Sequence, residues 1–256
     1  MCYDIKSSKE AQLKRAKRSG DEDAVKEIEQ TILPLTDLPL FHASGFQHPK
    51  LLIYTEESPY MPIVAQWGLV PHWVKDRAQQ QKFWNNTLNA RGETIFEKPA
   101  FRDAAKEHRC LVYVDGFYEH HHFKGKTYPY FISFKSGEPM VFAGLWNTWT
   151  DRDNGEHLTT FSIVTTTGNP LLARIHNNPK LEGPRMPFII PEGMEEEWLR
   201  AADTPPDQKA LTDMIRSYPA DSLQAHTVRR LRGKEYAGNI PEISEPFHYP
   251  ELEAVT

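Results

Sequence analysis

Short apolar segments bounded by glycine and proline fill the middle of the chain, and no other feature of the sequence constrains the fold as strongly. Segments of about four to eight residues with such boundaries are typical of β-strands. We predict strands at residues 51–54, 63–68, 109–114, 117–123, 128–134, 140–145, 159–166 and 186–190. The sequence Ser136-Gly137-Glu138-Pro139 has the composition of a tight turn, so we predict a hairpin between the strands on either side of it.

Helices are predicted on both sides of the strand-rich region. Residues 7–32 are rich in helix formers, with Ser7 and Ser8 as N-cap residues and Gly20 as an interruption. Prolines precede residues 192–201 and 207–218, where proline suits the first turn of a helix. Strands therefore follow strands and helices lie towards the ends, which predicts an α+β fold with a largely antiparallel, curled sheet.

No internal repeat or linker divides the chain, so we expect one domain over residues 1–240. Residues 241–256 contain prolines and little periodicity, and we expect them to form a C-terminal tail. The sequence contains no long apolar run and no secretory signal, which favours a cytoplasmic protein without membrane contact.

Composition and charge narrow the class of protein. Hydrophobic residues make up 39% and charged residues 25% of the 256 residues, as in ordinary globular proteins. The two cysteines, Cys2 and Cys110, are too few for a disulfide scaffold and do not have zinc-ligand spacing. The net charge of −5 argues against a general nucleic-acid coat but is compatible with a narrow basic cleft.

Cys2 directly follows Met1, and removal of Met1 would leave a free α-amine beside the thiol. The ordinary pKa values are roughly 7.7–8.0 for the amine and about 8.5 for the thiol, so we expect a minority of each group to be deprotonated at neutral pH. Such an aminothiol reacts with an aldehyde through an imine and then closes a thiazolidine ring. An internal cysteine cannot do this because its nitrogen is an amide. Some proteins begin with Met-Cys by chance, and Cys2 alone favours that interpretation.

Three other segments carry candidate side chains, each with a structural alternative. The turn from Trp67 to Trp73 either buries both indoles or stacks on nucleobases. Asn89 and Arg91 form either a structural hydrogen-bond cluster or a pair that faces a phosphate in a cleft. Glu119 follows aromatic residues on a strand, where its pKa would be raised as proton transfer requires; the alternative is a carboxylate in water.

Histidines raise a separate question. On a strand, His120 and His122 share one face and His121 lies on the other. No second group of ligands has recognisable spacing, so we expect no metal. A lone histidine such as His176 is usually structural, and it gains a chemical role only if it faces Cys2 and Glu119.

Taken together and in order, these segments resemble the SRAP family of SOS-response-associated peptidases or abasic-site processing proteins. The motifs are Cys2 after Met1, WGLVPHW, NARGET, EKPAFRDA, RCLVYVDGFYE, FAGLW, a Thr-rich strand, IH and PRMP. The resemblance spans residues 2 to about 190. It implies an α+β domain around a barrel-like antiparallel sheet, with a groove for single-stranded DNA. It also implies a crosslinking enzyme whose Cys2 forms a thiazolidine with an abasic site and shields the lesion during the DNA damage response.

The resemblance also implies roles for individual residues. Asn89 orients the reaction, Glu119 moves protons, and His176 assists sugar ring opening and crosslink reversal. The residues expected to contact DNA are Arg91, Trp67, Pro71, Trp73, Thr166 and Arg185. No cofactor or metal is expected. The expected partner is single-stranded DNA containing abasic sites, bound by a monomer that associates with the nucleoid during DNA damage.

The sequence departs from the family pattern at several positions. Tyr3 and Asp4 follow Cys2 where the family usually has Gly-Arg, so a phosphate contact is lost and an acid is added. The family's Tyr-Asn-x-x-Pro stretch appears only as Phe41-His42-Ala43-Ser44-Gly45, and His120 replaces a tryptophan. Residues 177–184 separate His176 from Arg185, where the family often has no such insertion.

Two other classes of function remain as alternatives. One is a thiol peptidase in which Cys2 and His176 cooperate and an Asn or Glu side chain orients them. Cysteine peptidases usually lower the thiol pKa with a helix N-terminus or an imidazolium, and Tyr3-Asp4 gives no sign of such a helix. The other is a non-catalytic module that binds single-stranded DNA, with Cys2 incidental.

Overall fold

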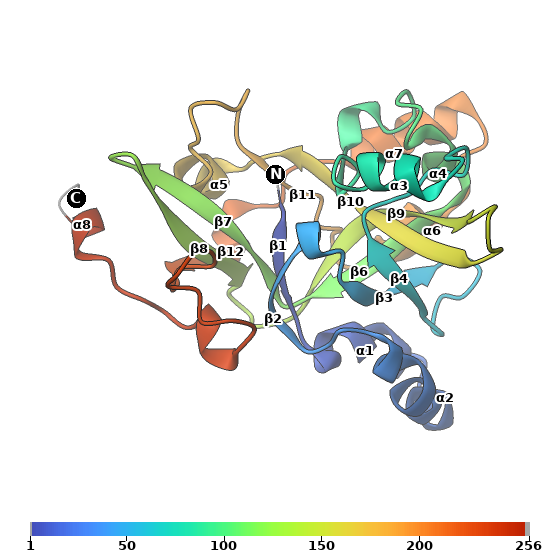
Figure 1. Cartoon of the computed structure of the whole chain (residues 1–256), viewed down its shortest axis with the longest axis horizontal. Helices are drawn as coiled ribbons and strands as arrows, with labels where there is room; N and C mark the ends of the chain where they lie inside the picture. Colours follow the sequence, from blue (N-terminus) through green and yellow to red (C-terminus); the bar gives the residue numbers. More distant parts are fainter. Residues whose placement is uncertain (1, 254–256) are drawn as a thin grey trace.

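Two β-sheets form the centre of the protein in a computed structural model that describes residues 2–253 (Figure 1). The strands are β1 (Asp4–Ser7), β2 (Leu40–Ser44), β3 (Lys50–Thr55), β4 (Ile63–Trp67), β5 (Asn89–Arg91), β6 (Arg109–Val114), β7 (Gly116–Phe123), β8 (Lys126–Phe134), β9 (Met140–Thr150), β10 (His157–Thr167), β11 (Arg185–Pro187) and β12 (Leu223–Thr227). The helices are α1 (Lys9–Lys17), α2 (Glu22–Glu27), α3 (Arg77–Trp84), α4 (Arg102–Glu107), α5 (Pro170–Ile175), α6 (Glu195–Leu199), α7 (Pro205–Met214) and α8 (Pro250–Glu253).

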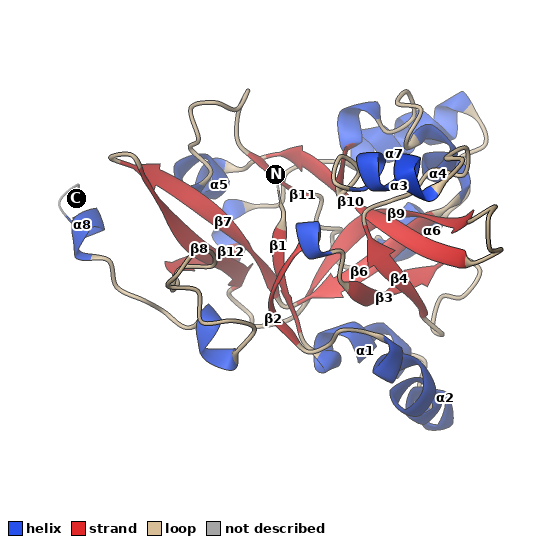
Figure 2. Cartoon of the chain, in the orientation of Figure 1, coloured by secondary structure: helices blue, strands red, loops and turns tan. Residues whose placement is uncertain are grey.

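One of the sheets closes on itself. Strands β10, β4, β3, β6 and β9 pair in that order, and β9 pairs again with β10, so the hydrogen-bonded ring is complete. Neighbours in the ring are antiparallel except for β4 and β10, which are parallel. The other sheet is open and antiparallel, with the order β12-β8-β7-β1-β2. Figure 2 shows helices around the barrel, so the predicted α+β class and barrel-like, mostly antiparallel sheet are confirmed.

Among the barrel strands, β3 and β6 are buried on both faces, which explains their continuous apolar runs. In β6, Leu111 and Tyr113 pack towards the helices, in the same cluster as residues of α1, α4 and α6. Cys110 and Val112 point the other way, into a core that includes residues of the second sheet. The alternation follows from the two-residue period of a strand. A single core thus joins the barrel to the sheet that holds the start of the chain.

The predicted hairpin at residues 136–139 is wrong. Strand β8 pairs with β7 and β12, whereas β9 pairs with β6 and β10, so the chain crosses from one sheet to the other here. It also crosses between β6 and β7, where a Cβ on Gly116 would lie only 2.3 Å from the carbonyl oxygen of Ile132. The composition of a turn indicates that the chain changes direction there. Which strands then pair depends on how residues distant in the sequence are buried together.

The helical prediction for residues 7–32 is confirmed in part. Ser8 caps α1 through a hydrogen bond from the Ala11 amide to its hydroxyl (3.1 Å), and Asp21 caps α2 in the same way. Gly20 lies between the two helices with φ of 74°. Ser7, however, ends strand β1, a strand that the polar sequence at residues 4–7 did not predict.

Arg109 is a buried charge that joins two helices to the barrel. Its side chain is 2% exposed, and burial lowers its pKa to about 10, so it stays charged at neutral pH. The guanidinium donates hydrogen bonds to carbonyl oxygens at the C-terminal ends of α4 and α6, namely those of Ala105, Lys106, Trp198, Leu199 and Arg200. Helix ends otherwise leave such carbonyls without a donor.

Residues 243–249 pack against the open sheet and the segment that follows it. The hydroxyl of Tyr249 donates to the Val228 carbonyl (2.8 Å), and the Phe247 amide donates to the Thr227 carbonyl (2.8 Å). Ile243 is buried with Tyr118. Within residues 2–253, no helix is long and apolar enough to cross a membrane.

Candidate functional site

Cys2 lies at the entrance to β1, an interior strand of the open sheet. Its side chain is fully buried, and its Sγ atom lies 3.8 Å from the carbonyl oxygen of Asp4. The side-chain amide of Asn89, in β5, donates a hydrogen bond to the carbonyl oxygen of Cys2 (2.8 Å). Asn89 Oδ1 is buried and has no hydrogen-bond partner among the described residues. The expected removal of Met1 concerns a residue outside those described.

The thiol of Cys2 is held in its neutral form. Burial raises its pKa well above the ordinary value, and the negative charge of Glu119 raises it further. The expectation that a minority of the thiol is deprotonated therefore does not hold in this environment, because the apolar core disfavours the thiolate.

Glu119 and His176 face each other beside the start of the chain. Glu119 lies on β7, and the pairing of Asp4 with Tyr118 and of Ile5 with Phe117 aligns β7 with β1. His176 is the C-cap residue of α5, and its Nδ1 lies 3.6 Å from Glu119 Oε1. Residues distant in sequence are thus brought together by one strand pair and one helix end.

Burial gives these two groups complementary protonation states. It raises the pKa of Glu119 to about 7 and lowers that of His176 to about 4. At neutral pH the imidazole is uncharged and the carboxyl group carries a proton about half of the time. Such a pair can both give and accept protons.

The pair opens into a pocket of about 390 Å³. His120 and His122 line this pocket, whereas His121 points away and contacts the Arg174 carbonyl through Nδ1 (3.0 Å), as the strand alternation predicts. The other lining residues include Tyr3, Asp4, Arg230 and Arg232. Among the described residues no group of three or more His, Cys, Asp or Glu side chains is arranged to hold a metal ion.

The buried carboxylate of Asp4 has two basic partners, which spacing in the sequence does not indicate. Burial alone would raise the pKa of Asp4, but a hydrogen bond with His42 and the charge of Arg232 outweigh it and lower the pKa. His42 Nε2 lies 3.0 Å from Asp4 Oδ1, and a terminal nitrogen of Arg232 lies 2.8 Å from Oδ2. Arg232 thus brings a cation to the buried carboxylate of Asp4.

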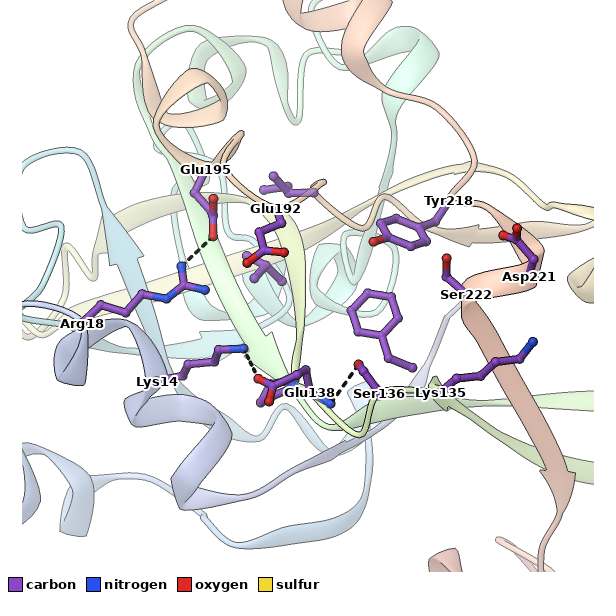
Figure 3. Close-up of a pocket in the computed structure, with 14 residues that line it drawn as sticks. Lys14, Arg18, Lys135, Ser136, Glu138, Glu192, Glu195, Tyr218, Asp221 and Ser222 are labelled. Atoms are coloured by element: carbon purple, nitrogen blue, oxygen red, sulfur yellow. Dashed lines mark hydrogen bonds and ion pairs between the residues drawn. The ribbon is translucent and has the colours of Figure 1, made fainter.

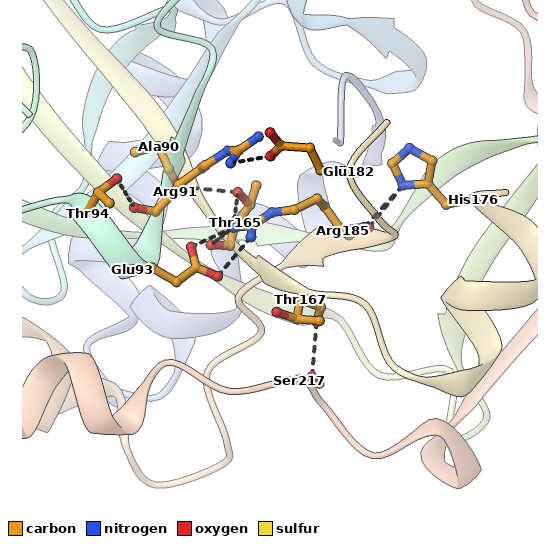
Figure 4. Close-up of polar contacts among 10 residues, drawn as sticks. All are labelled: Ala90, Arg91, Glu93, Thr94, Thr165, Thr167, His176, Glu182, Arg185 and Ser217. Atoms are coloured by element: carbon orange, nitrogen blue, oxygen red, sulfur yellow. Dashed lines mark hydrogen bonds and ion pairs between the residues drawn. The ribbon is translucent and has the colours of Figure 1, made fainter. Parts of the chain in front are cut away.

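Residues 177–184 form a strap that leaves the site and returns to it. The amide and carbonyl groups of Arg185 both approach His176 Nδ1, at 3.3 and 3.2 Å, so the insertion does not separate these two residues (Figure 4). Asn177 anchors the strap on β7 by two hydrogen bonds with the His122 backbone, at 2.7 and 3.0 Å.

Both candidate phosphate-binding arginines already have acidic partners. Arg185 forms a forked pair with Glu93 (2.8 and 2.9 Å) and is 14% exposed. Arg91 lies 3.1 Å from Glu182 of the strap, and these side chains are 53% and 85% exposed (Figure 4). An exposed pair of this kind is weak, so a phosphate can compete for Arg91.

The other expected DNA contacts lie largely inside the protein. Trp67 is completely buried, stacks on Phe161 and donates from Nε1 to the Leu88 carbonyl (2.7 Å), which is the structural interpretation of that residue. Pro71 and Thr166 are buried as well. Trp73 is half-buried, leaving part of one indole at the surface.

Another pocket, of about 530 Å³, lies beside α1 and the segment between β8 and β9 (Figure 3). Two of its cations are paired with acids, Lys14 with Glu138 at 2.5 Å and Arg18 with Glu195 at 2.8 Å. No histidine is among its lining residues, whereas His120, His122 and His176 line the pocket at Glu119. The pocket at Glu119 and His176 is therefore the stronger candidate for covalent chemistry.

Comparison with known proteins identifies similar chains. A family model described as SOS response associated peptidase (SRAP) matches residues 1–234, which include Cys2, Asn89, Glu119 and His176. The chain is 37% identical to "Abasic site processing protein YoqW" of Bacillus subtilis (strain 168) over 181 residues, 70% of this chain and 74% of that protein. It is 30% identical to "Abasic site processing protein HMCES" of Gallus gallus over 184 residues, 64% of this chain and 51% of that protein. A crystal structure of a Bacteroides thetaiotaomicron protein matches with a TM-score of 0.81 and 29% identity, covering 96% of this chain and 100% of that one.

Proposed function

The chain belongs to the SRAP family, and from this premise we propose that it processes abasic sites in single-stranded DNA by bonding covalently to them through Cys2. The observation that carries the proposal is the convergence of Cys2, Asn89, Glu119 and His176 around the start of β1. An abasic sugar exposes an aldehyde only when its ring opens, so an acid and a base beside a nucleophile suit this substrate.

The proposed reaction begins with opening of the sugar. Neutral His176 accepts the proton of the C1 hydroxyl group while protonated Glu119 gives a proton to the ring oxygen, and the aldehyde forms. The α-amine of Cys2, freed by removal of Met1, adds to the aldehyde carbon. His176 returns its proton to the new alkoxide, and Glu119 takes a proton from the nitrogen and passes it to the hydroxyl group, which leaves as water. Loss of the remaining nitrogen proton to Glu119 gives a neutral imine.

Ring closure completes the adduct. The Cys2 sulfur bonds to the imine carbon, the carbon–nitrogen double bond becomes single, and the thiol proton passes to nitrogen by way of Glu119. Because burial keeps the thiol neutral, the amine reacts first and the thiol second. Asn89 acts as a positioning residue, since its hydrogen bond to the Cys2 carbonyl orients the bond that carries the amine.

The same features argue against a thiol peptidase. A peptidase needs a reactive thiolate, which is usually stabilised by an imidazolium or a helix N-terminus. Here the pKa of Cys2 is raised, the pKa of His176 is lowered to about 4, and Cys2 leads into a strand. The neutral aminothiol suits addition to an aldehyde better.

The proposal is tested with a single-stranded oligonucleotide that carries one abasic site. Protein whose intact mass shows that Met1 is absent is expected to give a band of reduced mobility on a denaturing gel. Cys2→Ala abolishes this band, and Cys110→Ala, which removes the other buried thiol, keeps it. Absence of the band with processed wild-type protein would overturn the proposal, and cleavage of a peptide substrate instead would favour the peptidase.

Affinity for DNA should increase when Glu182, an acidic residue of the strap, is replaced by an uncharged one. Glu182→Gln frees Arg91 for a phosphate, and an exposed ion pair worth about 0.2–1 kcal/mol corresponds to roughly 1.5- to 5-fold tighter binding. The dissociation constant is measured by fluorescence anisotropy with an oligonucleotide that has no abasic site. Glu156→Gln, which breaks the exposed pair with Arg77, is the control and should leave affinity unchanged. Weaker binding by the Glu182 variant would contradict the expectation.

A further inference from the structure

An exposed aromatic pair stands beside the pocket that holds Glu119. Tyr3 and Phe46 pack with their ring centroids 5.0 Å apart and their planes at 38°. Phe46 is 47% exposed, although most large apolar side chains of the protein are buried. Tyr3 also lines the pocket with Glu119 and His176, so the pair continues directly from the candidate reaction site.

The turn that presents Phe46 is rigidly held. Phe46 lies in the 3₁₀ turn Gly45–Gln47, which is closed by a capping box between Ser44 and Gln47. The Gly45 amide donates to the Tyr3 carbonyl (2.7 Å), which fixes the turn to the start of β1. A rigid ring costs little conformational entropy when a ligand binds to it.

Trp67 supports this turn from below. A Cβ on Gly45 would lie 3.2 Å from three carbons of the Trp67 indole, so the glycine lets the turn rest on that ring. His48 directly follows the turn and has a φ angle of 51°. Its ring stacks on that of Trp84, with the ring centroids 3.8 Å apart. The buried tryptophan therefore gives Phe46 a firm base and does not itself contact a ligand.

We propose that Tyr3 and Phe46 form a stacking site for a nucleobase of the strand, next to the abasic nucleotide. The inference rests on the proposed function. When the abasic sugar occupies the pocket beside the pair, the base of the adjacent nucleotide lies against the two aromatic rings. A base can stack on an exposed ring whatever its identity, which suits a protein that must act at lesions in any sequence.

Substitution of Phe46 tests the inference without relying on the covalent reaction. Affinity for an oligonucleotide lacking an abasic site is expected to fall about 5- to 150-fold in Phe46→Ala, the range for loss of one stacked base. The slope of log affinity against log salt should not change, because no phosphate contact is lost. Phe46→Trp should keep wild-type affinity, and Leu35→Ala, which truncates another exposed apolar side chain, should have no effect.

A fluorescent base locates the contact. With 2-aminopurine beside a stable abasic analogue, wild-type protein should change the fluorescence of the base, and Phe46→Ala should lose most of that change. Equal affinity and equal fluorescence for wild type and Phe46→Ala would overturn the stacking site. If that result came with a normal covalent band, the proposed function would stand. An absent band would instead overturn the function, and the fluorescence would still decide the stacking site.

Discussion

Replacement of Glu119 by glutamine is expected to slow formation of the covalent DNA adduct by about 10²- to 10⁴-fold, the usual contribution of a general acid or base. Glutamine keeps the size of the side chain but cannot give or accept a proton at the pH of the reaction. The wild-type rate should depend on pH with an inflection near 7, the pKa to which burial raises Glu119, and the variant should lack it. Single-turnover rates between pH 5 and 9 measure both effects.

The same substitution should stabilise the folded protein. The pKa of Glu119 is about 7 when folded, against an ordinary value of 4.5, so the folded state holds the proton more tightly. Wild-type stability therefore falls as pH rises from about 4.5 to 7, and the penalty is complete above pH 7. Glutamine does not ionise, so the variant has no such loss of stability. The gain in free energy of unfolding should be absent near pH 4.5 and on the order of 3 kcal/mol above pH 7.

If Glu119 transfers protons, its replacement by glutamine slows the reaction but stabilises the fold. If Glu119 only packs in the core, the replacement lowers stability. Denaturant unfolding at pH 5 and pH 8 gives the stability of each protein, with Glu29→Gln, an exposed carboxylate on another part of the surface, as the control. A Glu119 variant that is less stable than wild type at pH 8 would show that the carboxylate has a structural role. A variant that reacts at the wild-type rate would remove it from the mechanism.

Replacement of Arg109 by methionine is expected to lower the free energy of unfolding by about 3–5 kcal/mol. Methionine fills much of the same volume but donates no hydrogen bond, so buried carbonyl groups at the ends of α4 and α6 lose their donor. Each unsatisfied buried polar group costs about 1–3 kcal/mol, and local rearrangement recovers part of the total.

Chemical denaturation measures this loss. Arg102→Met removes an exposed arginine from α4 and should change stability by less than about 0.5 kcal/mol. Arg109→Lys, which keeps the charge and some of the donors, should fall between the wild type and the methionine variant. A methionine variant as stable as the Arg102 control would show that the helix ends do not depend on this side chain.

Strands formed by continuous apolar runs could be predicted from the sequence. Strands held in place by polar residues that lie far apart in the sequence could not. Strand β6 could be recognised because both of its faces are buried. Strand β1 could not, because Asp4 is buried only through His42 and Arg232, and nothing in the spacing of these residues indicates that they meet. The hairpin prediction failed for the same reason: the partner of β8 is decided by sheet packing outside the local sequence.

The candidate site shows the same division. The raised pKa of Glu119 could be expected from its aromatic neighbours on the strand, and it is indeed raised. The distance of 3.6 Å between Glu119 and His176 depends on where α5 ends against β7, which only the fold determines. Trp67 illustrates a limit of composition, because an aromatic residue in a Gly-Pro turn is equally suited to a core and to a ligand surface, and here it lies in the core.

The position of β1 inside the open sheet, with β2 on one side and β7 on the other, affects how an adduct could be removed. A DNA strand bonded to Cys2 would be tethered to a strand that is hydrogen-bonded along both edges. A motor protein advancing along that DNA would pull on β1 through Cys2. The hydrogen bonds that join β1 to β2 and to β7 would then be loaded in shear and would have to break at the same time. Mechanical extraction would then be slow, and a stalled machine would be cleared sooner by chemical reversal or by proteolysis of the whole domain.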